Sequence, residues 1–337
     1  MKNRIYIIAY AISFFSACQP VKEDKFPTRN GQYLGQIPNG NRLELFAPGF
    51  VSTGLDESVI TFMPDGKECY WTIVFSGFET ILTSRLEKGR WTDPELVSFA
   101  GTYYDGWPAI QPDGKRMLFH SARPNPDSTN GISARYNLWY VERIQNGWSE
   151  PKIFGVPLNG AENSTCPSVT SSGTIYLSKR FSGGIEKLCR SALVNGTYQE
   201  LEVLPANVNV SEYNFHGYIS PDESYLVRPV GGRPDAIGGA WNYYVTFRNP
   251  GGQWSDLINL GKEVNSLFCA GVPSISSNGK YLFFQMRTQA RETFSLEKKY
   301  SLGELIDKEI RNASNGSADI YCIDAAIIEE LKPKNLK

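Results

Sequence analysis

The sequence contains little of what common catalytic sites use. Only two histidines occur, His120 and His216, and the H-E-x-x-H, G-x-S-x-G and phosphate-loop signatures are all missing. The net charge of -1 offers none of the positive field that nucleic-acid binding requires. We therefore expect no nucleic-acid partner, and the pattern predicts neither a cofactor nor a metal site.

The sequence also lacks an apolar run that would span a membrane comfortably. The N-terminal run from Ile5 to Phe15 is too short for this, and it follows Lys2 and Arg4. A basic region followed by a short apolar region is the order found in export signals. The pattern therefore predicts an exported protein whose first residues are removed.

The end of this signal resembles the lipobox of bacterial lipoproteins. Phe15-Ser16-Ala17-Cys18 has Phe where Leu is usual, and the resemblance implies that residues 1–17 are removed and Cys18 carries lipid. Gln19, where Asp would retain a lipoprotein in the inner membrane, implies the outer membrane. Lys22-Glu23-Asp24 resembles the export tag of surface lipoproteins in Bacteroidetes-type bacteria, and a solvated tether explains it equally well. An ordinary secretory signal cleaved nearby is the alternative to lipidation.

A hairpin unit recurs along the chain. Its clearest copy, Trp107 to Arg123, is a short apolar strand, a Pro-Asp-Gly turn and a second alternating strand. Asp accepts backbone N–H bonds across such a turn, and Gly supplies the positive φ. The copies succeed one another at steps of 48, 59, 50 and 56 residues, which suits the four-stranded blade of a β-propeller. The turns centre on Asp65, Asp113, Ser172, Asp222 and Asn278.

The rest of each period supplies two further strands. Third strands are indicated at residues 137–143, 187–191, 242–248 and 319–323. Turns with Gly and Trp, each followed by a fourth strand, lie at residues 89–94, 146–151 and 252–256, with 196–198 as a weaker copy. We therefore predict an all-β fold, a β-propeller of four-stranded antiparallel blades with five repeats. The Trp of each turn is expected to pack between neighbouring blades.

These motifs resemble the TolB-like, WD-related propeller repeats of bacterial envelope proteins. The resemblance rests on the Pro-Asp-Gly-Lys hairpins, the Leu-Trp-Tyr-Val third strand at residues 138–141 and the Asn-Gly-Trp-Ser-Glu-Pro turn at residues 146–151. It covers roughly residues 40 to 331, and TolB-like propellers are typically six-bladed. Residues 41–60 are therefore expected either to close the ring with the last blade or to belong to a degenerate sixth blade.

The chain divides into a signal, a tether, a propeller and a tail. Residues 18–40 are polar and rich in Pro, Gly and Asn, which predicts the tether, and the propeller and tail follow at 41–331 and 332–337. Residues 295–311 have apolar side chains at helical spacing, with Ser301 and Glu304 placed as a capping box. This helical insertion in the last blade either packs on an edge or forms a lid over the channel.

Cysteine usage indicates neither a disulfide framework nor a C-x-x-C pair. Beyond Cys18 the number is odd, so complete pairing is impossible. Cysteines at equivalent positions of different blades lie far apart, so we expect buried free thiols, with one disulfide as the alternative in an exported protein. The residues are Cys69, Cys166, Cys189, Cys269 and Cys322.

The loops that lead into the innermost strands are the first candidates for a binding site, because propellers usually bind at the channel mouth. These loops mix aromatic residues with carboxylates, which can stack on sugar rings and bond their hydroxyls, or accept a peptide segment. Turn capping is the alternative role for the carboxylates. The candidates are Tyr104, Asp105, Trp107, Glu162, Glu212 and His216.

Four arginines follow second strands and are expected to form a ring. Bidentate bonds from such a ring could hold the carboxylates or sulfates of an acidic glycan. Recurrence in blade after blade fits a structural role equally well. The residues are Arg123, Arg180, Arg233 and Arg287.

Two functions remain open at this point. The first is a non-catalytic outer-membrane lipoprotein, periplasmic or surface-exposed, whose propeller binds an envelope protein or a glycan at the channel mouth. The second is a glycan-active enzyme, a polysaccharide lyase or glycoside hydrolase, that uses His120, His216, Asp105 and Glu212. The missing catalytic signatures favour the first. Convergence of these four side chains would favour the second, because proton transfer needs hydrogen-bond reach.

Overall fold

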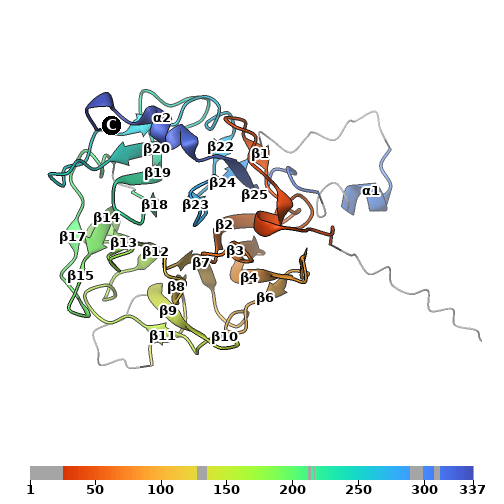
Figure 1. Ribbon diagram of the computed structural model, residues 1–337, viewed down its shortest axis with the longest axis horizontal. Coiled ribbons are helices and arrows are strands. Elements are labelled where there is room, and N and C mark those ends of the chain that lie inside the picture. The colour runs from red at the N-terminus through yellow and green to blue at the C-terminus, as the bar shows by residue number, and fades with distance from the viewer. Residues whose placement is uncertain are drawn as a thin grey trace, which may run out of the picture.

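The computed structural model describes residues 26–126, 135–211, 214–215, 217–288, 299–306 and 312–336. In these residues five antiparallel sheets stand around a central channel, so the predicted β-propeller is confirmed (Figure 1). Each hairpin found in the sequence supplies the innermost and second strands of one blade. We call the end of the channel with the hairpin turns the turn end, and the opposite end the loop end.

The strands of the blades follow one another in chain order. Blade 1 contains β2 (Asp56–Phe62), β3 (Glu68–Phe75), β4 (Phe78–Glu87), β5 (Arg90–Trp91) and β6 (Glu95–Leu96). Blade 2 contains β7 (Asp105–Ile110), β8 (Arg116–Ser121), β9 (Asn137–Ile144), β10 (Gly147–Trp148) and β11 (Lys152–Ile153). Blade 3 contains β12 (Ser164–Val169), β13 (Ile175–Arg180), β14 (Glu186–Ser191) and β17 (Glu202–Val203), with β15 (Leu193–Val194) and β16 (Thr197–Tyr198) as a small hairpin. Blade 4 contains β18 (Tyr218–Ile219), β19 (Tyr225–Gly231), β20 (Trp241–Phe247) and β21 (Ile258–Asn259).

Blade 5 joins the two ends of the propeller. Its C-terminal part contains β22 (Phe268–Cys269), β23 (Ser274–Ile275), β24 (Tyr281–Arg287) and β25 (Ala318–Asp324), and its outermost strand is the N-terminal β1 (Glu44–Leu45). Leu45 lies opposite Tyr321 in an antiparallel pair, and the Phe46 N–H donates to the Ile320 carbonyl at 2.8 Å. Residues 41–60 therefore close a five-bladed ring, and the described residues form no sixth blade.

The fourth strand of blades 1 and 2 is split into two short pieces. Both β5 and β6 pair with β4, and both β10 and β11 pair with β9. A proline lies in each gap, Pro94 in blade 1 and Pro151 in blade 2. Proline has no backbone N–H to donate to the ladder, so it interrupts a strand.

The folded body begins before the predicted boundary at residue 41. The short 3-10 helix η1 (Gln32–Gly35) buries Tyr33 and Leu34 in the core between blades 1 and 5. The Tyr33 ring stacks on Tyr281 with centroids 4.6 Å apart, and its hydroxyl lies 3.2 Å from the Ser277 hydroxyl. Because two large side chains of residues 18–40 are buried, the C-terminal part of the predicted tether is part of the propeller.

Tryptophans of the Gly-Trp turns pack against neighbouring elements, as predicted. The Trp148 indole of blade 2 donates to the Tyr70 hydroxyl of blade 1 at 2.9 Å, and Trp254 of blade 4 joins the core cluster of Tyr176 in blade 3. The cysteines beyond Cys18 are free thiols, and all of them except the half-buried Cys269 are buried. The expected free thiols are confirmed.

The helical insertion lies where the sequence placed it, between β24 and β25. Its described part contains α1 (Leu302–Ile306), and the Ser301 hydroxyl and the Glu304 carboxylate form the reciprocal bonds of a capping box. Figure 1 shows α1 outside the ring of blades on the side of β25, away from the channel. Of the two expectations for the insertion, this position fits packing outside the ring and not a lid.

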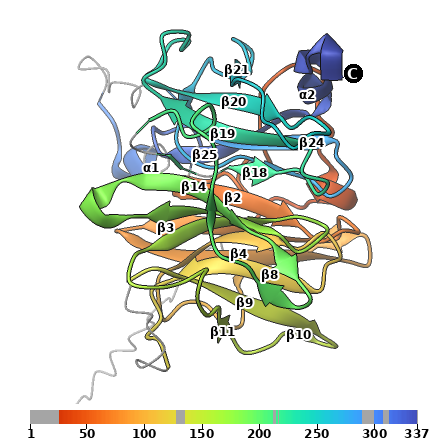
Figure 2. The same cartoon turned by 90° about the vertical axis from the view of Figure 1, so that its left-hand side faces the viewer.

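The remaining helices are short. Helix α2 (Ala326–Leu331) lies beside the strands of blades 4 and 5 (Figure 2). It buries Ile327 and Ile328 in the core of these blades. Two 3-10 helices, η2 (Ser182–Gly184) and η4 (Lys334–Leu336), complete the described elements. No helix in the described part of the chain is both long and apolar enough to cross a membrane.

Candidate functional site

Three innermost strands carry a β-bulge at the same position, six residues before the centre of the hairpin turn. The bulge residues are Val59, Trp107 and Cys166, with φ of 23, 55 and 51°. A bulge adds one unpaired residue and re-aims its side chain. The equivalent residue of blade 5 is Val272, and that of blade 4 is His216, which lies outside the described residues.

The described residues at this position meet across the channel. Val59, Cys166 and Val272 form one buried cluster, and Trp107 packs against it. We call these residues the channel plug. A cavity lies on the turn-end side of the plug. None of the described residues that line this cavity comes from the loop-end side. The plug therefore lies between this cavity and the loop end of the channel.

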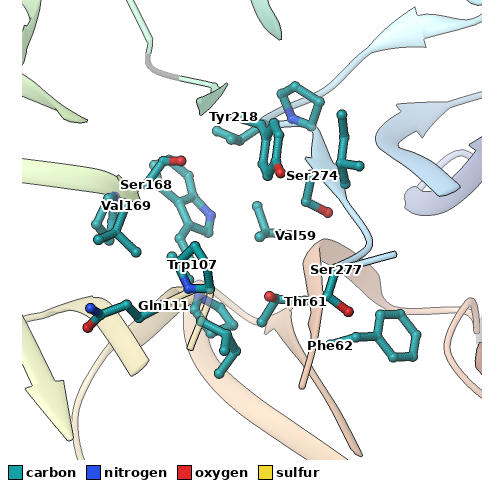
Figure 3. Close-up of a pocket in the computed structure, with 18 of the residues that line it drawn as sticks. Val59, Thr61, Phe62, Trp107, Gln111, Ser168, Val169, Tyr218, Ser274 and Ser277 are labelled. Atoms are coloured by element: carbon teal, nitrogen blue, oxygen red, sulfur yellow. The ribbon is translucent and has the colours of Figure 1, made fainter. Parts of the chain in front are cut away.

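A cavity extends from the channel plug to the turn end (Figure 3). Its volume is about 800 Å³, which includes solvent at its open mouth. The innermost strands form its walls, and hairpin-turn residues form its rim. The rim contains Pro64, Pro112, Pro221 and Ser277.

The described walls of the cavity carry no charged side chain and no histidine. The Cys166 thiol is the strongest nucleophile among them, and burial raises its pKa, which keeps it protonated. Thr61 and Tyr218 point hydroxyl groups into the cavity (Figure 3), and these groups have no hydrogen-bond partner in the described chain. Gln111 also lines the cavity, and its amide is directed away from the centre. The cavity can therefore hold an uncharged, partly apolar group that also makes hydrogen bonds, but it lacks an acid–base pair.

At the loop end, the predicted residues Asp105 and Arg123 form a buried ion pair. Arg123 also donates to the Ser121 hydroxyl and to the Phe99 carbonyl. Burial raises the pKa of Asp105 to about 6, although the Arg123 charge opposes this shift. The Arg123 pairing through Oδ1 of Asp105 is the structural role that the sequence left open, although Oδ2 of Asp105 is buried without a hydrogen-bond partner in the described chain.

His120 is paired across a blade boundary. Its Nε2 lies 2.6 Å from Oε1 of Glu79, a residue of β4 in blade 1, and its ring packs against Trp107 with centroids 4.8 Å apart. Burial opposes ionisation of Glu79, and the His120 charge and hydrogen bond lower the pKa of Glu79 overall. His120 is only 4% exposed. Glu79 was not among the predicted residues, because nothing in a single sequence shows which strands of two blades will face each other.

The other predicted arginines are also paired with carboxylates. Arg180 bonds Glu186 at 3.2 Å, Arg233 bonds Asp235 at 2.9 Å, and Arg287 bonds Asp56 at 3.2 Å. Each of these guanidinium groups is therefore already paired with a carboxylate. The structure therefore does not bring these arginines together as a free anion-binding ring.

Two predicted residues lie beside the loop end without forming one site. Tyr104 is half-buried under the Arg135 guanidinium, whereas the Glu162 carbonyl accepts a bond from Lys179 at 2.9 Å. Glu212, His216 and Cys18 lie outside the described residues, so their predicted roles stay predictions. Within the described ranges, no group of three His, Cys, Asp or Glu side chains is arranged to hold a metal ion.

Comparison with known proteins gives likenesses of fold. No family model and no curated protein matches the chain. A TolB from Acinetobacter baumannii is 16% identical, with a TM-score of 0.45 over 80% of this chain and 54% of that one. A protein described as TolB from Agrobacterium tumefaciens is 13% identical, with a TM-score of 0.42 over 80% and 90%. A GH62 hydrolase in complex with xylotriose is 10% identical, with a TM-score of 0.39 over 85% and 98%.

The chain spans about half the length of the Acinetobacter protein. These likenesses assign neither a ligand nor an activity. TolB proteins, which the repeat motifs resemble, are among the solved structures to which this five-bladed propeller is similar.

Proposed function

We propose that this protein is a non-catalytic binding propeller of the cell envelope, and that it holds an uncharged segment of a protein partner in the cavity at the turn end. The observation that supports the proposal most directly is the composition of the described walls. They offer apolar surface and neutral hydrogen-bonding groups, with no charged side chain. An extended peptide segment carries neutral backbone donors and acceptors along with its side chains, so it matches such a surface.

The shape of the cavity supports a segment that enters without passing through. The buried side chains of the channel plug lie at the inner end, whereas the rim of hairpin turns is open. The tip of a loop, or an uncharged side chain with its flanking backbone, therefore fits better than a chain threaded along the axis. A charged terminus would be desolvated there without a partner, which is costly.

The enzymatic alternative has less support. It requires His120 and Asp105 to act together at an accessible site, and each is buried against another partner, Glu79 and Arg123. The positions of Glu212 and His216 lie outside the described residues, so they add nothing to either function. We therefore propose binding without turnover.

The test uses a photo-crosslinking amino acid placed in the protein inside living cells. Incorporated at Gln111, on the cavity wall, it should give one discrete protein adduct. Incorporated at Glu87, the exposed last residue of β4, it should give no adduct. Thr61→Trp narrows the cavity and should abolish the Gln111 adduct without changing the thermal unfolding midpoint by more than a few degrees.

A synthetic peptide of the crosslinked segment should then bind the purified chain, with affinity at least about tenfold weaker in Thr61→Trp, a loss of about 1.4 kcal/mol. Equal adducts at Gln111 and Glu87, or an adduct that Thr61→Trp leaves unchanged, would contradict a site in the cavity. A carbohydrate adduct at Gln111 would instead indicate that the partner is a glycan.

We also propose that Cys18 anchors the protein to the outer membrane. The support is the lipobox resemblance at residues 15–18 with Gln19 after it. Cells fed a labelled fatty acid should label the wild-type protein and not Cys18→Ser, and the wild-type protein should sediment with outer-membrane fragments. Release of unlabelled wild-type protein into the periplasm would instead indicate an ordinary secretory signal.

A further inference from the structure

The loop end carries the exposed aromatic side chains of the described chain. Phe75 ends β3, Tyr103 precedes β7, Phe181 follows β13 and Phe268 begins β22, and all four positions are at the loop end. They are 36–42% exposed. Large aromatic rings gathered at one end of a protein mark an interaction surface.

On blades 1 and 2 these rings continue into a row of tilted ring contacts. Phe75 contacts Phe78 with centroids 5.6 Å apart, and Phe78 contacts Tyr104 at 5.2 Å. The Arg135 guanidinium lies 5.6 Å from the Tyr104 centroid and 5.2 Å from the Tyr136 centroid. We call these five side chains the aromatic ladder. It crosses the boundary between the two blades at the surface.

Arg135 differs from the other arginines at this end. Arg123, Arg180, Arg233 and Arg287 are each bonded to a carboxylate. Arg135 is exposed and has no ion-pair partner in the described chain. The guanidinium lies beside the Tyr104 and Tyr136 rings, and the planar fork of an arginine can bind a carboxylate in bidentate fashion.

We propose that the aromatic ladder binds a uronic-acid-containing oligosaccharide, with the sugar carboxylate on Arg135 and the sugar faces on Phe75, Phe78 and Tyr104. A pyranose uronate joins a flat C–H face directly to a carboxylate, and the ladder places aromatic rings beside a guanidinium that has no ion-pair partner in the described chain. An acidic peptide would satisfy Arg135 but would leave the exposed ring faces without a matched flat surface. This site is separate from the cavity at the turn end, so it does not depend on the proposed function.

Calorimetric titration of the purified chain with a tetrasaccharide of galacturonic acid tests the proposal. Saturable binding is expected, weakened at least about tenfold when the carboxylates are methyl-esterified and to a similar degree by Arg135→Ala. Arg135→Lys keeps the charge but loses the planar fork, so it should bind more weakly than wild type. Tyr104→Ala removes one stacking face and should also weaken binding.

Arg180→Ala is the matched control, since it removes an exposed, already paired arginine from the same end. It should keep the wild-type affinity within about twofold. No saturation at millimolar sugar, or equal affinity in wild type and Arg135→Ala, would overturn the proposal. Equally tight binding of a tetrapeptide of aspartate would also overturn it, because charge alone would then explain the recognition.

Discussion

An asparagine recurs at one position of blades 2, 3 and 4 and fixes the third strand of each. The Asn209 side chain accepts a bond from the Leu188 N–H at 2.8 Å and donates to the Leu188 carbonyl at 3.1 Å. Asn159 makes the same pair of bonds with Leu138, and Asn265 makes it with Tyr243. Each asparagine thus gives the backbone N–H of one third-strand residue an acceptor and adds a second donor to the carbonyl of the same residue.

Asn209→Ala should destabilise the protein by about 3 kcal/mol. The change leaves the Leu188 N–H and the Leu204 carbonyl without this partner in a buried region, whereas the Leu188 carbonyl keeps its bond from the Leu204 N–H. An unsatisfied buried polar group costs about 1–3 kcal/mol. Urea unfolding followed by circular dichroism measures the loss. Asn146→Ala, on an exposed turn, should change stability by less than about 0.5 kcal/mol; equal effects of the two changes would contradict the role of Asn209.

These asparagines have a signal in the sequence, although they were not among the predicted residues. Leu158-Asn159, Val208-Asn209 and Val264-Asn265 recur at steps of 50 and 56 residues, the same steps as the hairpin turns of blades 3, 4 and 5. The pairing of His120 with Glu79 has no such signal. It depends on how two blades pack, which no local pattern encodes.

Among the elements, the N-terminal strand that closes the ring depends on one anchoring side chain. Phe46 is fully buried next to β1 and contacts Phe283 of blade 5 at 4.9 Å and Phe62 of blade 1 at 6.2 Å. Phe46→Ala should cost about 3–5 kcal/mol, as expected for a buried aromatic side chain. Phe75→Ala, which truncates an exposed ring, is the control in the same thermal unfolding assay and should cost under about 1 kcal/mol. A similar loss in both variants would mean that Phe46 does not anchor the closure.

A pair of buried carboxyl groups lies at the same junction. Glu57 of β2 accepts bonds from the Thr53 N–H at 3.1 Å and from the Thr53 hydroxyl at 2.5 Å, and Asp319 of β25 accepts from the Ser314 N–H at 2.7 Å. Burial raises the pKa of Glu57 well above its ordinary range and that of Asp319 to about 6. The folded protein therefore retains a proton that the unfolded chain releases.

Stability should consequently fall as pH rises from about 4 to about 6. Below about pH 4, both carboxyl groups are protonated in the folded and the unfolded chain, so the contribution of this pair to stability is complete. Above that pH only the unfolded chain loses these protons freely, and this loss favours unfolding. Thermal midpoints measured across this range should show the fall in wild type and a shallower one in Asp319→Asn. Asp113→Asn, on an exposed hairpin turn, should keep the wild-type slope. An Asp319→Asn profile with the same slope as wild type would contradict the raised pKa of Asp319.

The elements themselves were largely predictable, and their irregularities were not. Alternating apolar residues and turn chemistry located the hairpins, because both are local properties of the chain. The bulges at Trp107 and Cys166 precede Pro108 and Pro167, a position that ordinarily favours extended backbone with negative φ. Their positive φ follows from convergence at the channel axis, which only the closed ring imposes.

For the whole molecule, the repeat count predicted the propeller but left its closure open. Strand β1 is two residues long, so it has no alternation to recognise. The candidate site was predicted at the loop end, since loops converge there, whereas the cavity opens at the turn end. Prolines of the repeated turns line its rim, so one motif that specifies the hairpin also shapes the cavity, and the sequence alone does not separate these two roles.

The two ends of the propeller should act as independent sites. The channel plug lies between the cavity and the loop end, and residues that share no partner usually contribute additively to binding. Thr61→Trp should therefore leave uronate affinity within about twofold of wild type, and Arg135→Ala should leave crosslinking at Gln111 unchanged. In the double variant, each ligand titrated by calorimetry should show the same loss of affinity as in the single variant at its own site. A loss of uronate binding in Thr61→Trp would instead show that the plug transmits a change between the ends. Trp107, which belongs to the plug and contacts His120, would then be the residue to vary next.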